Sequence, residues 1–263
     1  ISEQRSLYSI VDLTADEMQS LERNLSEKSS PVLRFMGINW VETLSMLFRI
    51  KQKVIEGGKY DQNRKEEIAR VLSSFEQEFY DTVENRSYYY LECLKNKRTA
   101  FYYNGSDNLN FKLFLCINLA KTKSKKNKIL KRFIESDDSL FAICNDWSVL
   151  KLISILQSSS TFFSRADEWN ITLLVNKTTD LYITGDQPVV NVSLIDKITS
   201  NNLALYYPIS PILAILINNQ NKHHKNNIVE ISNDEIRFYN NLIKQYSVRE
   251  IYSSNEEGIK SII

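Results

Sequence analysis

Glycine and proline are scarce in this sequence, with 6 Gly and 4 Pro among 263 residues. Both residue types punctuate turns, so their scarcity argues against a fold of many short strands and favours long helices. Hydrophobic residues make up 43% of the chain and charged residues 25%, as in ordinary globular proteins. A chain of this length can form one large domain or two small ones around a sizeable core.

Cysteine is also rare, and its pattern excludes two kinds of site. Cys93, Cys116 and Cys144 are widely spaced and form no CxxC pair, which argues against a zinc knuckle and against a disulfide framework. All three have apolar neighbours, so we expect each to be a small buried hydrophobic residue. Unpaired cysteines are typical of a reducing compartment, and we therefore expect a cytoplasmic protein.

An excess of one charge sign is missing as well. The 33 Lys and Arg residues nearly balance the 32 Asp and Glu residues, which excludes a globally basic nucleic-acid-binding protein but not a local basic patch. No apolar run approaches the roughly 18 residues of a membrane span, so we expect no membrane partner. The chain starts at Ile1 without a signal peptide, and we expect it to be a processed, trimmed or incompletely observed product.

Helical periodicity dominates the first 165 residues. We expect helices over residues 14–32, 39–57, 68–83, 88–94, 111–117 and 145–156. The third of these should bury one face, formed by Ile68, Val71, Leu72, Phe75, Phe79 and Val83. Asn104 to Asp107 is a sequence typical of a turn.

Strand periodicity begins near Trp169, after which Ile171, Leu173 and Val175 alternate with polar residues. Short β-rich runs follow, and their simplest arrangement is an antiparallel meander of 181–184, 189–192, 203–207 and 212–217. Ser232 and Glu235 have the spacing of a capping box, which predicts a helix continuing to Tyr246. A last strand is expected over 248–252.

The order of these elements predicts an α+β fold rather than an alternating α/β fold. We expect a mostly helical N-terminal part, residues 1–165, followed by a small antiparallel sheet with one C-terminal helix, residues 166–263. No clear Gly/Pro/Ser linker separates them, so we expect the two parts to form one integrated domain.

The most distinctive local sequence is an apolar run that enters Thr184-Gly185-Asp186-Gln187-Pro188, after which a second apolar run begins. Gly185 can adopt backbone angles that other residues avoid, and Pro188 forces Gln187 to be extended. Asp186 is therefore presented at a fixed strand end. Its carboxylate has two interpretations: an Asx-type turn in which it accepts main-chain amides, or a general base or metal ligand.

The stretch from Trp169 to Ile217 resembles the bacterial family known as domain of unknown function 4238. Its members typically carry a strand ending in Ile-Thr-Ser-Asp-Asn-Pro-Val and a later Pro-Leu-Ser-Pro segment, which look like Ile183–Val189 and Pro208–Pro211 here. This chain departs from the pattern with Gly185 in place of Ser and Gln187 in place of Asn. The family's usual N-terminal His-x-x-Pro segment has no counterpart, and the resemblance implies no particular activity.

A run of basic residues without an acidic one extends from Lys121 to Arg132. Such a run can neutralise phosphates and release counterions, although a solvated helix face is the commoner explanation. No aromatic residue within it could stack on bases. As candidate phosphate contacts we select Lys121, Lys125, Lys126 and the more distant Arg165.

Two further features are weighed as binding sites. Tyr88, Tyr89 and Tyr90 are consecutive and cannot all face inward on a helix, so a protein interface is plausible there beside ordinary core packing. His223 and His224 are adjacent in a polar loop, where they point apart and have no third ligand nearby in the sequence. A metal site at these histidines is therefore not expected.

Two hypotheses of different classes remain. The first is a hydrolase acting on nucleic acid or a nucleotide, as a bacterial toxin or anti-phage defence effector, with Asp186 as the acidic centre and Thr184 and Gln187 shaping it. Such chemistry is compatible with a divalent metal ion. The second is a non-enzymatic interaction or regulatory module, in which Asp186 only holds a turn and a protein partner or second copy binds near Tyr88 to Tyr90.

Overall fold

The computed structural model describes residues 62–120, 169–192, 204–219 and 227–255, together with the single positions 19, 23, 46, 53, 56, 57, 155, 158 and 159. The chain divides into two compact units, one of residues 1–83 and 126–164 and the other of residues 84–125 and 165–263. The helices expected over 14–32, 39–57 and 145–156 fall outside the continuously described residues. The second unit contains both motif segments. The expected division into residues 1–165 and 166–263 stays a prediction.

Helix α3 spans Gln62–Lys95, 34 residues, and unites the helices predicted over 68–83 and 88–94. No glycine or proline interrupts this stretch, so no backbone feature ends the helix earlier. Val83 is buried as expected, whereas the prediction that Val71 is buried is wrong. The helix ends where Lys97 adopts a positive φ of 55° and the Arg98 amide donates to the Cys93 carbonyl over 2.8 Å, which satisfies one of the last carbonyls.

A short 3-10 helix, η3 (Ala100–Tyr103), leads into helix α4 (Gly105–Ala120). The predicted turn near Asn104 is therefore the start of α4. Cys116 in α4 and Cys93 in α3 are buried and free, as predicted, and Cys144 lies outside the described residues. No helix in the described part of the chain has both the length and the apolar character needed to cross a membrane.

Aromatic rings join the end of α3 to η3 and α4. The Tyr90 ring stacks on Phe101 with centroids 4.9 Å apart and meets the edge of Phe111 at 5.8 Å. Phe101 and Phe111 in turn make an edge contact at 5.2 Å. Offset stacked and edge-to-face geometries are the favoured ones for aromatic pairs. This cluster fixes residues 84–95 of α3 to the core of the second unit.

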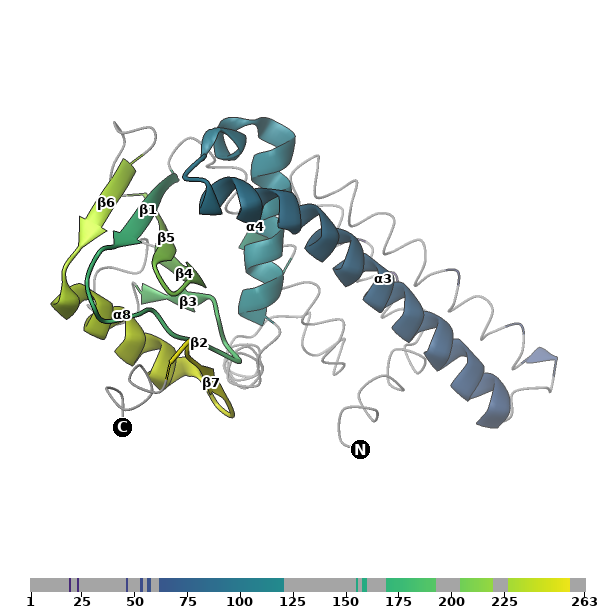
Figure 1. The fold of residues 1–263 in the computed structure, drawn as a ribbon. Coiled ribbons are helices and arrows are strands. Elements are labelled where there is room, and N and C mark those ends of the chain that lie inside the picture. The colour runs from purple at the N-terminus through teal and green to yellow at the C-terminus, as the bar shows by residue number, and fades with distance from the viewer. Residues whose placement is uncertain are drawn as a thin grey trace. The chain divides into compact units, whose positions relative to one another are not determined.

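The second unit contains a five-stranded sheet with the order β3-β4-β5-β1-β6. Its strands are β1 (Asn170–Asn176), β3 (Val190–Asn191), β4 (Ala204–Ser210), β5 (Leu213–Asn218) and β6 (Asn227–Ile231). A two-stranded antiparallel sheet pairs β2 (Thr184–Gly185) with β7 (Ile251–Tyr252). Helix α8 (Asn233–Tyr246) lies between β6 and β7 in the chain. Helices first, strands next and a helix near the end confirm the α+β class (Figure 1).

The expected antiparallel meander is only partly correct. Strands β3, β4 and β5 pair antiparallel in sequence order, but β1 pairs antiparallel with β5 and parallel with β6, so the sheet is mixed. The predicted strand over 181–184 enters a sheet only at Thr184. Its preceding main chain instead bonds to a side chain of α8, at Leu181 and Ile183.

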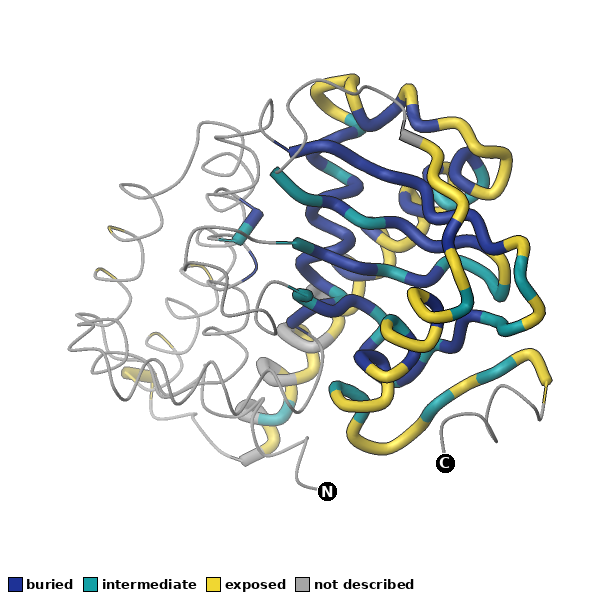
Figure 2. Tube along the Cα trace, turned by 90° about the vertical axis from the view of Figure 1, so that its left-hand side faces the viewer, coloured by how far each residue is buried: buried dark blue, intermediate teal, exposed yellow. Residues whose placement is uncertain are grey.

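Different helices cover the two faces of the large sheet. On one face, the ring of Phe114 in α4 lies 6.0 Å from that of Tyr207 in β4. On the other face, the neighbouring residue Tyr206 stacks on Tyr239 of α8 with centroids 4.3 Å apart, because successive strand residues point to opposite faces. All seven residues of β1, an interior strand between β5 and β6, are buried (Figure 2).

The predicted capping box at the start of α8 is confirmed. The Ser232 hydroxyl accepts the Glu235 amide, and the Glu235 carboxylate accepts the Ser232 amide over 2.8 Å. Both donors would otherwise be unsatisfied at the helix N-terminus. The helix then places Ile236 and Ile243 in the core beneath the sheet.

Buried tyrosines beneath α8 make the stability of this unit sensitive to alkali. Burial raises the pKa of Tyr206 well above its usual value, so the folded state keeps a proton that the unfolded chain loses above about pH 10. Stability should therefore fall as pH rises from about 10, by roughly 1.4 kcal/mol per pH unit for each such tyrosine. We predict that Tyr206→Phe makes this decline shallower by that amount, as measured by urea unfolding between pH 9 and 12.

The same substitution should cost little at neutral pH, because the buried Tyr206 hydroxyl has no hydrogen-bond partner among the described residues. Phe238→Leu, at an exposed position without a titrating group, serves as the control and should leave the pH dependence unchanged. An identical alkaline slope in Tyr206→Phe and the natural chain would contradict the prediction.

Candidate functional site

The Ile183–Val189 motif runs from the core to the surface of the second unit. Ile183 belongs to the core cluster beneath α8, and Thr184 and Gly185 form β2 against Tyr252 and Ile251 of β7. Asp186 follows directly and is half-buried, as is Thr184, whereas Gln187 is buried. Of the three residues predicted to form a catalytic centre, Asp186 and Thr184 therefore reach solvent.

Asp186 binds the connection between α8 and β7. Its amide donates to the Glu250 carbonyl over 3.0 Å. Its Oδ1 accepts the Val248 amide over 2.9 Å, and its Oδ2 accepts the Arg249 amide over 3.1 Å. Main-chain amides thus occupy both carboxylate oxygens, as the structural interpretation expects, but the donors lie 62 and 63 residues later in the sequence instead of within a local Asx turn.

Gly185 allows this connection to approach closely. A Cβ atom at this position would lie 2.9 Å from the Glu250 carbonyl oxygen and would overlap the Ser247 hydroxyl. The replacement of Ser by Gly, relative to the family pattern, therefore matches the tight contact between β2 and residues 247–250. This contact places the Asp186 carboxylate within reach of the two amides.

Two titratable side chains that the sequence did not single out lie beside Asp186. The Tyr252 hydroxyl donates to the Glu250 carboxylate. This hydrogen bond is the main cause of a raised pKa of Tyr252, to which the negative charge of Asp186 also contributes. Alternation along residues 250–252 places both side chains on one side of the strand, but the pairing of β7 with β2 could not be read from the sequence.

The chemistry available at this place is limited to hydrogen bonding and proton transfer by two carboxylates and a protonated phenol. Among the described residues, no group of three or more His, Cys, Asp or Glu side chains is arranged to hold a metal ion. The predicted phosphate contacts lie outside the described residues: Lys121, Lys125, Lys126 and Arg165. His223 and His224 lie outside them as well.

One main-chain hydrogen bond joins the second motif to the residue directly before the first. Pro208–Pro211 comprises the end of β4 and the start of the turn that follows. The pairing of β4 with β5 shifts register between Pro208 and Ser210. The Tyr182 amide donates to the Pro211 carbonyl over 2.9 Å. The two segments that resemble the family are therefore neighbours in space, and their contact connects the sheet to the segment that leads to Asp186.

Asn240 holds the same segment from the side of α8. Its side-chain amide donates to the Leu181 carbonyl over 2.8 Å, and its side-chain oxygen accepts the Ile183 amide over 3.1 Å. The side chain thus replaces a strand partner for two main-chain groups. The available sequence signal was a polar residue on the otherwise apolar face that includes Ile236 and Ile243.

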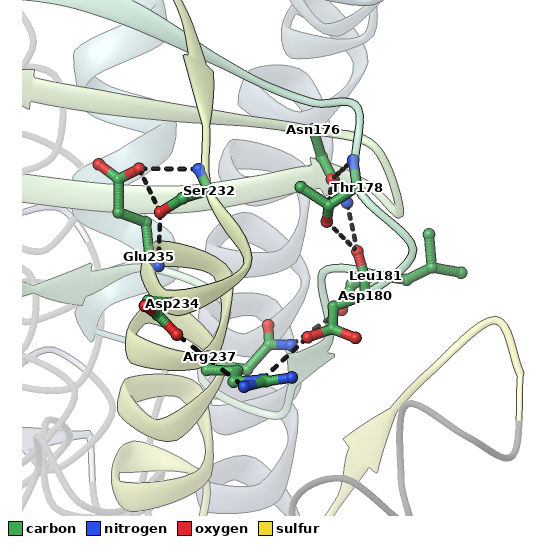
Figure 3. A network of polar contacts seen from close by, with 9 residues as sticks. Asn176, Thr178, Asp180, Leu181, Ser232, Asp234, Glu235 and Arg237 are labelled. Atoms are coloured by element: carbon green, nitrogen blue, oxygen red, sulfur yellow. Dashed lines mark hydrogen bonds and ion pairs between the residues drawn. The ribbon is translucent and has the colours of Figure 1, made fainter.

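A polar network on the surface joins the end of β1 to α8 (Figure 3). The Asn176 side-chain oxygen accepts the Thr178 amide over 2.7 Å and shapes the turn. Arg237 of α8 then pairs with Asp180 over 3.0 Å. Because this ion pair is partly exposed, it contributes at most about 1 kcal/mol. These contacts position the segment before the first motif rather than form a reactive site.

The three consecutive tyrosines divide between core and surface, as predicted. Tyr90 is buried and donates to the Asp107 carboxylate over 3.0 Å, whereas Tyr88 is 66% exposed and Tyr89 is 59% exposed. Burial and the bond to Asp107 raise the pKa of Tyr90 to about 12. We call the surface formed by Tyr88 and Tyr89 the tyrosine face.

Comparison with known proteins gives one family. A family model described as "Protein of unknown function (DUF4238)" matches residues 44–257. No curated protein and no solved structure matches the chain significantly. The matched range contains both motif segments, the large sheet and α8. The chain therefore belongs to the family described as Protein of unknown function (DUF4238).

Proposed function

We propose that the second unit is a non-enzymatic protein-interaction module whose contact surface is the tyrosine face of α3. The observation that carries this proposal is the exposure of Tyr88 and Tyr89 immediately before the buried Tyr90. Tyrosine is enriched at protein interfaces, since its ring supplies apolar contact area and its hydroxyl can bond to the partner. Two exposed tyrosines on consecutive positions of one helix offer a surface suited to a protein partner.

The tyrosine face is presented rigidly, which favours binding. Tyr90 fixes this part of α3 through its ring contacts with Phe101 and Phe111 and its hydrogen bond to Asp107. Little backbone order therefore has to be gained when a partner binds, and the entropic cost of association is reduced.

The state of Asp186 supports the same proposal. A general base or metal ligand directs a carboxylate lone pair at the reacting group, and a main-chain amide already engages one of the two lone pairs on each Asp186 oxygen. The most distinctive residue of the motif is then explained by its role in joining β2 to the α8–β7 connection.

Crosslinking in cells tests the tyrosine face. With a photoreactive amino acid at position 85, one turn away on the exposed side of α3, we expect covalent capture of a discrete protein partner. Tyr88→Ala combined with Tyr89→Ala should reduce capture at least about tenfold, since buried interface tyrosines often contribute more than about 1 kcal/mol each. The matched control Thr82→Ala, at another exposed α3 position, should leave it unchanged. Capture that is indifferent to both tyrosines would refute the proposal.

A hydrolase acting on nucleic acid or a nucleotide, as a toxin or defence effector, is the second candidate. It is favoured by one observation, the presence of Glu250 and Tyr252 beside the half-buried Asp186. In this proposal Thr184 and Gln187 shape the site, and Lys121, Lys125, Lys126 and Arg165 attract phosphates. Loss of phosphodiester hydrolysis in Asp186→Asn with an unchanged unfolding free energy would support it. Activity retained in that variant would exclude this role for Asp186.

A further inference from the structure

Strand β6 forms one end of the five-stranded sheet. It pairs on one side only, in parallel with β1, from Thr172 opposite Asn227 to Asn176 opposite Ile231. An edge strand of this kind presents alternate N–H and C=O groups that can pair with a further strand. Within the described ranges of the second unit, no strand pairs with its outer side (Figure 1).

The two ends of the sheet differ in a way that matters for association. The opposite edge, β3, has only two residues, Val190 and Asn191, and a short edge is one of the ways proteins avoid edge-to-edge pairing. β6 has five residues and exposes Ile228 (50%) and Val229 (43%). Because neighbouring strand residues point to opposite faces, apolar surface is available on both sides of this edge.

We propose that β6 pairs antiparallel with β6 of a second copy of this chain, so that two sheets join across a two-fold axis. Either exposed apolar residue of β6, Ile228 or Val229, can lie on such an axis. With the axis at Val229, that residue meets itself and Ile228 lies opposite Glu230 of the second copy. With the axis at Ile228, that residue meets itself. In either register, apolar residues meet at the axis.

Charge selects the antiparallel direction. Glu230 is exposed and pairs with Lys177 of the same chain, and it is the only charged residue of β6. A parallel in-register pair would place Glu230 directly beside Glu230 of the second copy, and like charges directly opposite each other are destabilising. The antiparallel pair separates the two carboxylates on opposite sides of the axis, and a two-fold arrangement closes the assembly at two chains.

Analytical ultracentrifugation of the whole chain tests the pairing. We expect the weight-average mass to rise toward that of two chains between about 10 µM and 1 mM, because an interface based on five-residue strands is small. Val229→Lys places two ammonium groups at or near the axis. It should raise the protein concentration at which half of the chains are dimeric at least tenfold. Phe238→Lys, at a similarly exposed apolar position on α8, should leave it unchanged. A natural chain that remains monomeric throughout, or a dimer indifferent to Val229→Lys, would overturn the proposal.

Cysteine crosslinking tests the register and direction. Paired residues of antiparallel strands have Cα atoms about 4.5 or 5.5 Å apart, a separation that a disulfide can bridge. Under mild oxidation we expect a crosslinked dimer from Val229→Cys or from Ile228→Cys, and none from the natural chain, whose described cysteines are buried. Comparable crosslinking of Ile228→Cys, Val229→Cys and Glu230→Cys would indicate parallel in-register strands and would overturn the proposed arrangement. Unchanged far-ultraviolet circular dichroism in each variant shows that the fold is retained.

Discussion

Asn240→Ala is expected to destabilise the second unit by about 3 kcal/mol. The substitution removes the partner of the Leu181 carbonyl and of the Ile183 amide. Leaving a buried main-chain group unsatisfied costs roughly 1–3 kcal/mol, and Asn240 itself is buried. Urea unfolding measures the loss. Asn241→Ala changes the adjacent, exposed residue and should stay within about 0.5 kcal/mol of the natural chain.

Asn240→Asp separates the two hydrogen bonds. A carboxylate can still accept the Ile183 amide, but it has no proton to donate to Leu181 and its charge is buried, so at neutral pH the loss should be at least as large as in Asn240→Ala. Burial raises the pKa of such a carboxyl group. Stability relative to the natural chain should therefore recover as pH falls and the group becomes a donor. Equal stability of Asn240→Ala and the natural chain would contradict the role assigned to this side chain.

Asp186→Ala should cost about 2 kcal/mol of unfolding free energy. The carboxylate accepts the amides of Val248 and Arg249, and hydrogen bonds to charged groups contribute roughly 1.5–3 kcal/mol when buried and less when partly exposed, as here. Asp186→Asn keeps one acceptor oxygen but turns an NH2 group toward an amide donor, so we expect a loss of about 1 kcal/mol. Asp234→Asn, at a fully exposed carboxylate on α8, should remain within about 0.5 kcal/mol.

The sign of this effect distinguishes the two functional proposals. Active-site residues are often held at a cost to stability, so their removal commonly leaves the protein as stable as before or more stable. A structural acceptor behaves in the opposite way, because its removal leaves two amides without partners. An Asp186→Ala variant more stable than the natural chain would therefore favour the hydrolase.

Local features of the fold could be predicted because they depend on residues close in sequence. The capping box of Ser232 and Glu235 is confirmed, and so is the expectation that three consecutive tyrosines cannot all face inward. Each follows from helix geometry alone. The α+β order could also be predicted, since the change from helical to strand periodicity near Trp169 is visible in the pattern.

Pairing between distant segments could not be predicted in the same way. β6 is parallel to β1 although 50 residues separate their ends, and periodicity does not encode which strands become neighbours. For the same reason, the sequence did not predict the amide donors to Asp186, which lie in the connection after α8. Nor did it predict the hydrogen bonds that Asn240 of α8 makes to Leu181 and Ile183. The sequence thus singled out Asp186, whereas its spatial neighbours Glu250 and Tyr252 were not singled out.

Amide hydrogen exchange at residues 247–249 tests most directly whether Asp186 is a structural acceptor. In the natural chain we predict protection of the Val248 and Arg249 amides, and in Asp186→Ala we predict its loss at both. The Ser247 amide, which donates to the Ile243 carbonyl over 2.9 Å, should stay protected in both proteins. Unprotected Val248 and Arg249 amides in the natural chain, or protection that survives the removal of the carboxylate, would contradict the account.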